Sequence, residues 1–446
     1  LQVFIRKVYA SSLLARRVKV IVVITFLGLL TAGLALIPKV ALGLDQRIAL
    51  PSDSYLIQYF NDLDAYFGSG PPVYFVTRNV NVTERHHQQQ LCGRFTTCEE
   101  FSLPFVLEQE SKRSNVSYIS GSTASWIDDF FYWLNPQQDC CKEGDEICFE
   151  DRTPAWNISL YGMPEGDEFI HYVEKWIESP TDASCPLGGK APYSNALVID
   201  QKRVMTNASH FRTSHTPLRT QDDFIKSYIS ARRIADGISK EHGIDVFPYS
   251  KTYIFFDQYV SIVRLTGTLL GFAVAIIFAL TSIILGSVAT GAVVTTTVVM
   301  ILVDIMGAMA VAGVSLNAVS LVNLVICVGI AVEFCAHIAR AFMFPSRAIM
   351  EKVPTKFRGK DARAWTALVN VGGSVFSGIT VTKLLGVCVL AFTRSKIFEI
   401  YYFRVWLALI LFAATHALIF LPVALSYFGG EGKFTIDNTL YFGNAY

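Results

Sequence analysis

Residues 265–285 read LTGTLLGFAVAIIFALTSIIL, and residues 289–311 read ATGAVVTTTVVMILVDIMGAMAV. Each run is long enough for an α-helix to cross the hydrocarbon core of a bilayer, which takes roughly 20 apolar residues. Only Gly286, Ser287 and Val288 separate the two runs. We therefore expect two membrane-spanning helices joined by a tight turn at the membrane surface.

Four further apolar runs extend this pattern along the chain. One lies at 18–37, where Lys19 near the start is the only charged residue and Pro38 ends the run. The others lie at about 316–339, 367–392 and 398–427. A signal peptide is another interpretation of the first run, but its apolar core would be shorter and a cleavage site of small residues would follow. The sequence therefore predicts a polytopic protein with six membrane-spanning helices.

The composition agrees with a membrane protein. Of the 446 residues, 52% are hydrophobic and 17% are charged, whereas about a quarter of the residues are charged in a typical soluble domain. The net charge of +1 argues against a nucleic-acid-binding surface, which needs a marked excess of basic residues. Because the sequence begins at Leu1 without a methionine, we expect a processed or partial chain.

The distribution of basic residues predicts which ends of the helices face the cytosol. Basic residues cluster around the start of the first span and in the loop 340–366 after the fourth span (Arg6, Lys7, Arg16, Arg17 and Lys19; Arg340, Arg347, Lys352, Lys356, Arg358, Lys360 and Arg363). Residues 1–17 are expected to form an amphipathic segment on the cytosolic surface. The tail 429–446 is also expected to be cytosolic, and residues 435–446 carry no interpretable pattern.

The long segment 38–258 is then expected to be a lumenal domain. It holds the four Asn-x-Ser/Thr sequons, which predict glycosylation at Asn81, Asn115, Asn157 and Asn207. It also holds six of the nine cysteines (Cys92, Cys98, Cys140, Cys141, Cys148 and Cys185). An even number of cysteines in an oxidising compartment predicts disulfides, and their spacing leaves the pairing open. A zinc site is the alternative, but no paired Cys-x-x-Cys or histidine pattern supports one.

The pattern within this domain predicts a mixture of strands and helices. Residues 71–77 are typical of a strand that follows a turn. The spacing of apolar residues predicts helices over 125–134, 167–178 and 220–239. An α+β fold follows, with a small sheet covered by helices. Asp128 and Asp129 could supply two carboxyl groups for hydrolysis, but we favour an exposed helix face as the explanation.

Ionisable residues inside the predicted spans are candidates for function, because a charge in the membrane costs several kcal/mol. Glu333 and His337 are four residues apart and share one helix face, where they could exchange a proton. The alternative is a neutral structural hydrogen bond, or a position of His337 near the cytosolic interface. We predict a proton relay through Glu333, His337, Asp304 and Lys383, and Arg404 and His416 are further ionisable residues of the spans.

Several runs of sequence resemble the Niemann–Pick type C family of sterol transporters. The longest extends from Ser315 to Phe342 and includes Gly329-Ile-Ala-Val-Glu333. The others keep the family's order over nearly the whole chain: Gly43-Leu-Asp-Gln, Gly70-Pro-Pro-Val-Tyr-Phe-Val, Ser125-Trp-Ile-Asp-Asp, Cys140-Cys141, Phe247-Pro-Tyr-Ser, Gly373-Ser-Val-Phe-Ser-Gly-Ile-Thr and Thr415-His416 to Leu421-Pro422. Patched-type receptors share the Gly-x-x-x-Glu element, but the runs outside the spans fit the sterol transporters better.

The resemblance is to the second half of such a transporter, which is a resistance–nodulation–division permease built from two parallel six-span halves. It implies a ferredoxin-like core for the lumenal domain and the pairs Cys92–Cys98, Cys140–Cys185 and Cys141–Cys148. An additional cysteine pair of the animal members is absent and the loop between Cys148 and Cys185 is shorter, which suggests a fungal member. No enzymatic activity, cofactor or metal is implied.

The implied function is the transport of a sterol such as cholesterol or ergosterol. The sterol would pass from the lumen of a lysosome or vacuole through a lumenal tunnel into the limiting membrane, and proton movement would bias the transport. The implied partners are the sterol, membrane lipids, the N-terminal half with its sterol-binding, middle lumenal and sterol-sensing domains, and a soluble lumenal sterol carrier of the Niemann–Pick type C2 kind. The alternative is a sterol receptor of the Patched type without net transport.

Overall fold

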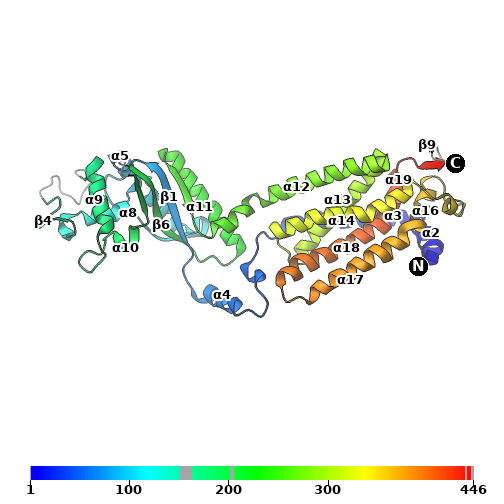
Figure 1. Cartoon of the computed structure of the whole chain (residues 1–446), viewed down its shortest axis with the longest axis horizontal. Helices are drawn as coiled ribbons and strands as arrows, with labels where there is room; N and C mark the ends of the chain where they lie inside the picture. The colour runs from blue at the N-terminus through cyan, green and yellow to red at the C-terminus, as the bar shows by residue number, and fades with distance from the viewer. Residues whose placement is uncertain (1, 151–162, 201–204, 437–438, 443–446) are drawn as a thin grey trace. The chain divides into compact units, whose positions relative to one another are not determined.

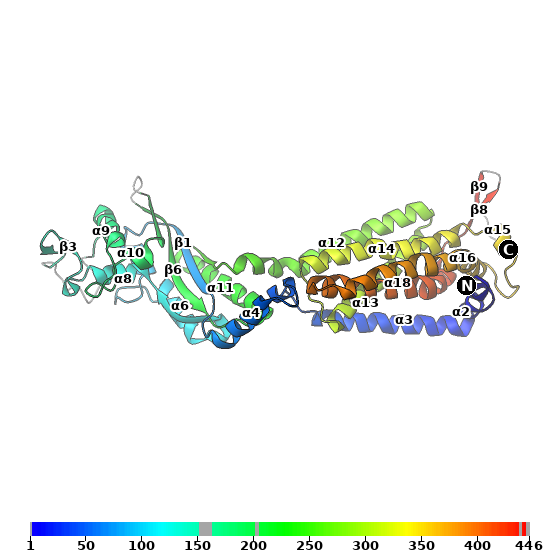
Figure 2. The same cartoon turned by 60° about the horizontal axis from the view of Figure 1, so that its bottom comes forward.

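A computed structural model describes residues 2–150, 163–200, 205–436 and 439–442 of the chain. The chain divides into two compact units. Leu1–Phe60 and Ser261–Tyr446 form one unit, which holds most of the apolar helices and is called the membrane unit below. Asn61–Val260 form the other, which holds a β-sheet and is called the sheet domain (Figures 1 and 2).

Among the described residues, six helical segments are long and apolar enough to cross a membrane, which confirms the predicted polytopic fold. The first is α3 (Arg16–Leu36) followed by η2 (Ile37–Lys39), and the next three are the single helices α12 (Tyr253–Leu285), α13 (Val288–Val311) and α14 (Ala318–Met343). The fifth contains α16 (Lys360–Ser374), η5 (Val375–Val381), α17 (Thr382–Cys388) and η6 (Val389–Phe392). The sixth contains η7 (Phe398–Arg404), α18 (Val405–Thr415), η8 (His416–Phe420) and α19 (Leu421–Phe428).

Two of these helices extend beyond the predicted apolar runs. The second begins at Tyr253 rather than near residue 265, and the fifth begins at Lys360 rather than at 367. A helix does not have to end where the hydrocarbon ends. The length of an apolar run therefore indicates the part of a helix inside the hydrocarbon, and not the length of the whole helix. The loop predicted at 340–366 is shortened accordingly and contains α15 (Arg347–Met350).

The turn between α12 and α13 has the expected tight geometry. Gly286 has a φ of +58°, a left-handed conformation that glycine adopts without steric cost at the end of a helix. The Ser287 hydroxyl then accepts a hydrogen bond from the Thr290 backbone N–H and caps the start of α13. Residues 286–288 therefore reverse the direction of the chain in a tight turn, as predicted from the short gap.

The segment before the first span is helical and amphipathic. It consists of α1 (Gln2–Phe4), η1 (Ile5–Tyr9) and α2 (Ala10–Leu13). Ile5 and Leu13 are buried, whereas Arg6 and Lys7 are exposed. This segment packs in part against the fifth span, where the Trp365 indole N–H donates to the Ser11 hydroxyl at 3.3 Å.

The sheet domain has the strand order β2-β6-β1-β7, and neighbouring strands are antiparallel. The strands are β1 (Pro72–Val80), β2 (Ile119–Ala124), β6 (Met205–His215) and β7 (Asp245–Tyr249), and β5 (Leu197–Asp200) also pairs with β6. Helices α5 (Arg85–Leu91), α6 (Leu103–Lys112) and α7 (Ser114–Ser117) connect β1 to β2, and α11 (Gln221–His242) connects β6 to β7. This order is the split β-α-β arrangement of a ferredoxin-like fold.

The residues between β2 and β6 hold a second group of elements (Figure 1). They include α8 (Trp126–Trp133), η4 (Pro136–Gln138), the hairpin of β3 (Lys142–Glu143) and β4 (Glu146–Ile147), α9 (Gly166–Glu178) and α10 (Lys190–Tyr193). The helices predicted at 125–134, 167–178 and 220–239 correspond to α8, α9 and α11. Phe75 of β1 and Trp126, Phe130 and Trp176 are fully buried in one continuous core.

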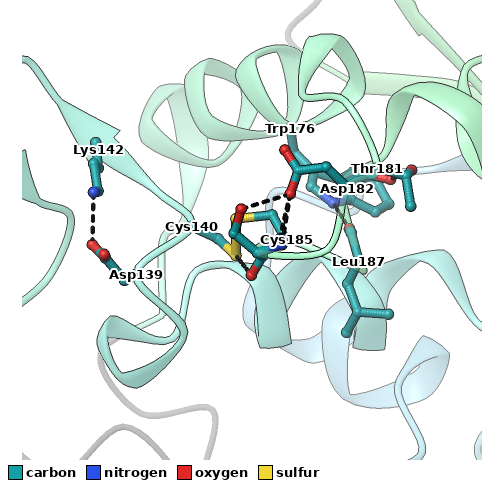
Figure 3. Close-up of a disulfide and its surroundings, with 10 residues drawn as sticks. Asp139, Cys140, Lys142, Trp176, Thr181, Asp182, Cys185 and Leu187 are labelled. Carbon is teal, nitrogen blue, oxygen red and sulfur yellow. Dashed lines mark hydrogen bonds and ion pairs between the residues drawn. A yellow bond between two sulfur atoms is a disulfide. The ribbon is translucent and has the colours of Figure 1, made fainter.

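Three disulfides lie in the sheet domain, and they join Cys92 to Cys98, Cys140 to Cys185 and Cys141 to Cys148. Figure 3 shows the bond between Cys140 and Cys185. The Asp182 carboxylate beside it accepts hydrogen bonds from the Ser184 and Cys185 backbone N–H groups, which lower the pKa of Asp182. Cys327, Cys335 and Cys388 are free and lie in the helices of the membrane unit.

Near the end of the chain, β8 (Lys433–Ile436) pairs with β9 (Thr439–Phe442).

Candidate functional site

Glu333 and Lys383 form an ion pair between two spans. Glu333 lies on α14 and Lys383 on α17, and the lysine ammonium also lies 5.2 Å from the centre of the Phe334 ring. The Lys383 and Glu333 side chains remain 31% and 45% exposed, so the pair lies at the surface of the unit. Pairing reduces the cost of placing either charge in a membrane.

His337 does not join this pair. It lies one helical turn after Glu333 with an exposed side chain. Within the described part of the chain, His337 makes no hydrogen bond or ion pair. The i,i+4 spacing therefore places the two residues on one face, but the acidic group of Glu333 has its partner on a different helix.

Asp304 and His416 form a second pair in the interior of the membrane unit. His416 Nε2 lies 3.3 Å from Asp304 Oδ2, and the two side chains are 0% and 1% exposed. The other imidazole nitrogen, Nδ1, lies 2.8 Å from the Phe412 carbonyl oxygen. Because a carbonyl only accepts hydrogen bonds, Nδ1 carries a proton and Nε2 faces the carboxyl group. The pair joins α13 of the third span to η8 of the sixth.

Small and aromatic residues from α3 enclose this pair. The Phe26 ring meets the His416 imidazole edge to face, with ring centres 4.6 Å apart. A Cβ on Gly33 would lie 3.1 Å from Asp304 Oδ1, and a Cβ on Gly307 would lie 2.8 Å from the Gly33 Cα. The two glycines therefore let α3 and α13 approach closely, as small residues do at helix crossings in membranes.

A polar cluster joins the chain after the first span to the start of α14. The Ser315 hydroxyl donates to the Gly43 carbonyl at 2.6 Å and lies 2.7 Å from the Tyr401 hydroxyl. The Asn317 amide donates to the same carbonyl at 3.2 Å. Two of the runs that carry the family resemblance, at Gly43 and Ser315, are thus in direct contact, although they are far apart in the sequence.

Arg404 of the sixth span bonds to the end of the third span. One guanidinium nitrogen donates to the Ala312 carbonyl at 2.7 Å, beyond the last turn of α13, and another lies 2.9 Å from a Glu399 carboxylate oxygen. A basic group at the carboxyl end of a helix bonds the carbonyls that have no partner within the helix. Arg404 therefore caps α13.

The interpretation of Asp128 and Asp129 as an exposed helix face is wrong, because both side chains are buried. Asp128 accepts hydrogen bonds from the Gly93 and Arg94 backbone N–H groups at 3.0 and 3.1 Å. Asp129 accepts from the Arg94 guanidinium at 2.6 Å and from the Tyr193 hydroxyl at 2.5 Å. Burial raises the pKa of Asp128, and the hydrogen bonds from the Gly93 and Arg94 backbone oppose the rise. The carboxyl groups anchor the Cys92–Cys98 loop to α8.

The predicted glycosylation sites are only partly described. Asn115 is exposed, whereas the half-buried Asn81 amide oxygen accepts from the Thr83 hydroxyl at 2.7 Å. Asn157 lies outside the described residues, and Asn207 lies on β6 with a side chain outside the described part. Glycosylation of the four asparagines stays a prediction.

His215 is a buried titratable residue that the sequence did not single out. It ends β6, and its Nδ1 lies 2.7 Å from the Tyr118 carbonyl oxygen. Its Nε2 lies 2.6 Å from the Tyr253 hydroxyl. The imidazole is therefore bonded at both nitrogens. Burial lowers the pKa of His215 to about 4, so the imidazole is neutral at pH 7. A lone histidine in a polar run offers no sequence signal of this environment.

We expect the sheet around His215 to lose stability as the pH falls. The pKa rises from about 4 in the folded domain to its ordinary value of 6.5 on unfolding, so the unfolded chain binds more protons between these values. The stabilisation is complete above pH 6.5, and at pH 5 about 2 kcal/mol of it is lost. Hydrogen exchange of the β6 amides, corrected for intrinsic rates, measures the change.

His215→Gln should flatten this pH dependence, because glutamine cannot take up a proton. His171→Gln on α9 is the matched control, since the His171 imidazole is exposed. An equally steep loss of β6 protection in His215→Gln would contradict the assignment to this imidazole.

No family model matches the chain, but curated relatives match it almost from end to end. It is 39% identical over 443 residues to the NPC intracellular cholesterol transporter 1 of Sus scrofa, and 35% identical over 451 residues to the NPC1-like intracellular cholesterol transporter 1 of Rattus norvegicus. It is 33% identical over 453 residues to the NPC intracellular cholesterol transporter 1 homolog 1b of Drosophila melanogaster. These matches cover 96%, 96% and 97% of this chain, but only 34%, 33% and 35% of the respective relatives.

Proposed function

We propose that this chain, a partial member of the family of NPC1 and NPC1-like intracellular cholesterol transporters, forms one part of a sterol-transporting protein. The observation that carries the proposal is the match of nearly the whole chain to about a third of proteins named as cholesterol transporters. The names of these relatives describe transport, which fits a protein that is not an enzyme. Sterol transport is therefore the function that the chain supports best.

The proposed path runs from a lumen into the limiting membrane of a lysosome or vacuole. The sheet domain supplies part of the wall of a lumenal tunnel, and the rest comes from the N-terminal half of the same protein. A soluble sterol carrier of the Niemann–Pick type C2 kind delivers the ligand. Movement along such a path needs no covalent step, because a sterol exchanges one apolar environment for another.

Proton coupling is the second part of the proposal. The pairs Glu333–Lys383 and Asp304–His416 each connect two different spans, so a change in protonation would alter a contact between helices. Protonation of Glu333 would remove the negative charge that holds the Lys383 ammonium. A relay through these residues and His337 would thereby convert a proton gradient into a change of helix packing.

We expect Glu333→Gln to lower sterol export by at least about tenfold in the intact protein that contains this chain, a change of about 1.4 kcal/mol in the barrier. Lys383→Gln should have a similar effect because it removes the partner. Glu399→Gln is the matched control, since Glu399 lies on another span and pairs with Lys396 and Arg404. Export of a labelled sterol at matched expression measures the effect.

Normal export in both Glu333→Gln and His337→Ala would reject the relay and leave sterol transport in place. A crosslinkable sterol that labels the protein without being exported would instead favour a receptor of the Patched type, with which the chain shares the Gly329-x-x-x-Glu333 element. The two experiments therefore separate coupling from transport.

A further inference from the structure

A cavity of about 400 Å³ opens at one end of the membrane unit. It lies at the start of α3, the loop before α16 and the end of α19, and six of its lining residues carry the argument: Arg16, Lys19, Lys356, Phe357, Asp361 and Tyr427. We call it the basic cavity. Its volume falls within the range of about 300–1,000 Å³ that is typical of small-molecule sites.

The basic cavity carries an excess of positive charge. Lys19 is buried, and its ammonium donates to both Asp361 carboxylate oxygens at 2.9 and 3.1 Å, so these two charges balance. Arg16 and Lys356 are exposed, and neither forms an ion pair with a carboxylate among the described residues. The lining therefore presents two uncompensated cations beside a fixed internal salt bridge.

Contacts of Lys19 join the segments that form the wall of the basic cavity. The Lys19 ammonium lies 4.6 Å from the centre of the Tyr427 ring, which ties the first span to the end of the sixth. It also lies 3.4 Å from the Ser426 hydroxyl. Phe357 is buried beneath the exposed Lys356. The cavity is thus built from three separated segments of the chain that are already joined, rather than from a flexible basic tail.

Backbone groups add to the positive potential. Helix α3 begins at Arg16, and its N-cap residue Ala15 offers no side-chain hydrogen bond. Among the described residues, no side chain at the N-cap satisfies the first N–H groups of α3, and the amino end of a helix carries a partial positive charge. This feature supports the side-chain cations in favouring an anion.

We propose that the basic cavity binds the phosphate-bearing headgroup of an anionic membrane lipid. The cavity lies where the first span begins and the sixth ends, which is the depth of lipid headgroups for helices of this length. Basic pockets between spans bind such headgroups, and tyrosine is enriched at this interface. Arg16 and Lys356 would contact the phosphate, and the Lys19–Asp361 pair would keep the cavity open.

Titration of the detergent-solubilised full chain with short-chain phosphatidylinositol 4-phosphate tests this proposal, with the bound fraction read by native mass spectrometry. We expect the double variant Arg16→Gln/Lys356→Gln to bind about 30-fold more weakly, since each surface cation contributes about fivefold. Lys356 lies in a loop, and the single variant Lys356→Gln should weaken lipid binding by about fivefold.

The double variant Arg17→Gln/Lys352→Gln is the matched control. Both residues are exposed and neighbour the same two segments, but they do not line the cavity. This control should bind within about threefold of the original chain because neither side chain lines the cavity and exposed charges outside it are screened by salt. Thermal unfolding without lipid checks that the variants fold alike.

Equal weakening in the two double variants would overturn the proposal, because it would show diffuse attraction rather than a site. Inorganic phosphate is the second arm of the titration. If phosphate displaces the lipid at a concentration similar to that of the lipid itself, the assignment to a lipid headgroup is rejected in favour of a free anion. Failure of phosphate to compete, together with loss of binding in Arg16→Gln/Lys356→Gln only, is the expected result.

Discussion

Replacement of His416 by leucine is expected to destabilise the membrane unit by about 3–5 kcal/mol, the cost of removing one partner from a buried ionisable pair. The Asp304 carboxyl group is 1% exposed and has His416 Nε2 3.3 Å away. Neither carboxylate oxygen has a hydrogen-bond partner among the described residues, so the imidazole is the polar group that faces the carboxyl group. Without the imidazole, the carboxyl group would stay in the interior of the helices with no polar neighbour. Unfolding of the detergent-solubilised chain measures the loss.

The double variant Asp304→Leu/His416→Leu should recover most of this stability. Replacing both members of a buried pair by apolar residues is often neutral or favourable, because no desolvated polar group remains. Thr415→Val tests for general sensitivity of the sixth span, since Thr415 is the exposed neighbour of His416. Additive losses from Asp304→Leu and His416→Leu would show that the two residues do not act as a pair.

Loss of the Cys140–Cys185 disulfide is expected to destabilise the sheet domain by about 4 kcal/mol. The two cysteines are 45 residues apart in the sequence, so the bond restricts a long loop in the unfolded chain. The bond between Cys141 and Cys148 closes a separation of only seven residues, and its loss should cost about 2 kcal/mol. Urea unfolding of the full-length variants Cys140→Ser/Cys185→Ser and Cys141→Ser/Cys148→Ser, followed by limited proteolysis, compares the two.

The second double variant serves as the control for the first, because it removes a neighbouring bond and leaves Cys140–Cys185 in place. Equal losses in the two variants would contradict a loop-entropy origin. The stabilisation by both disulfides would then have to come from the packing around each bond.

The six spans could be predicted because the thickness of a bilayer determines how long an apolar run must be. The ends of the helices could not, since Tyr253 and Lys360 begin helices outside the apolar runs. The order of the sheet was also beyond local pattern. β1 pairs with β6, where Pro72 is opposite Ser214, and no short-range signal reports a contact over that sequence distance.

The sequence identified ionisable residues of the spans but not the pairs that they form, and their role in a relay stays a prediction. Glu333, Lys383 and Asp304 were identified because ionisable groups are costly in a membrane. Helical spacing suggested His337 as the partner of Glu333, whereas tertiary packing brings Lys383 to it from another span. The pairing of Asp304 with His416 was likewise not visible in the sequence, because it depends on how α13 and η8 pack.

The burial of Asp128 could not be predicted for a related reason. A polar residue on a predicted helix is ordinarily assigned to the exposed face. Here the backbone N–H groups of Gly93 and Arg94 bind the carboxyl group, and they belong to a loop that precedes α8 by about thirty residues. Sequence patterns describe side chains along one element and contain no information on such distant backbone donors.

The position of β1 in the middle of its sheet has a consequence for biosynthesis. A ribosome completes β1 long before β6 and β7, which are the strands on either side of it. All six paired cysteines precede β6 in the sequence, so oxidation can finish while both edges of β1 are still unpaired. During that interval the backbone N–H and C=O groups of β1 have no partner strand, which is the state in which a newly made strand is most prone to aggregate. A chaperone that binds unpaired apolar strands would therefore protect β1 until β6 is synthesised.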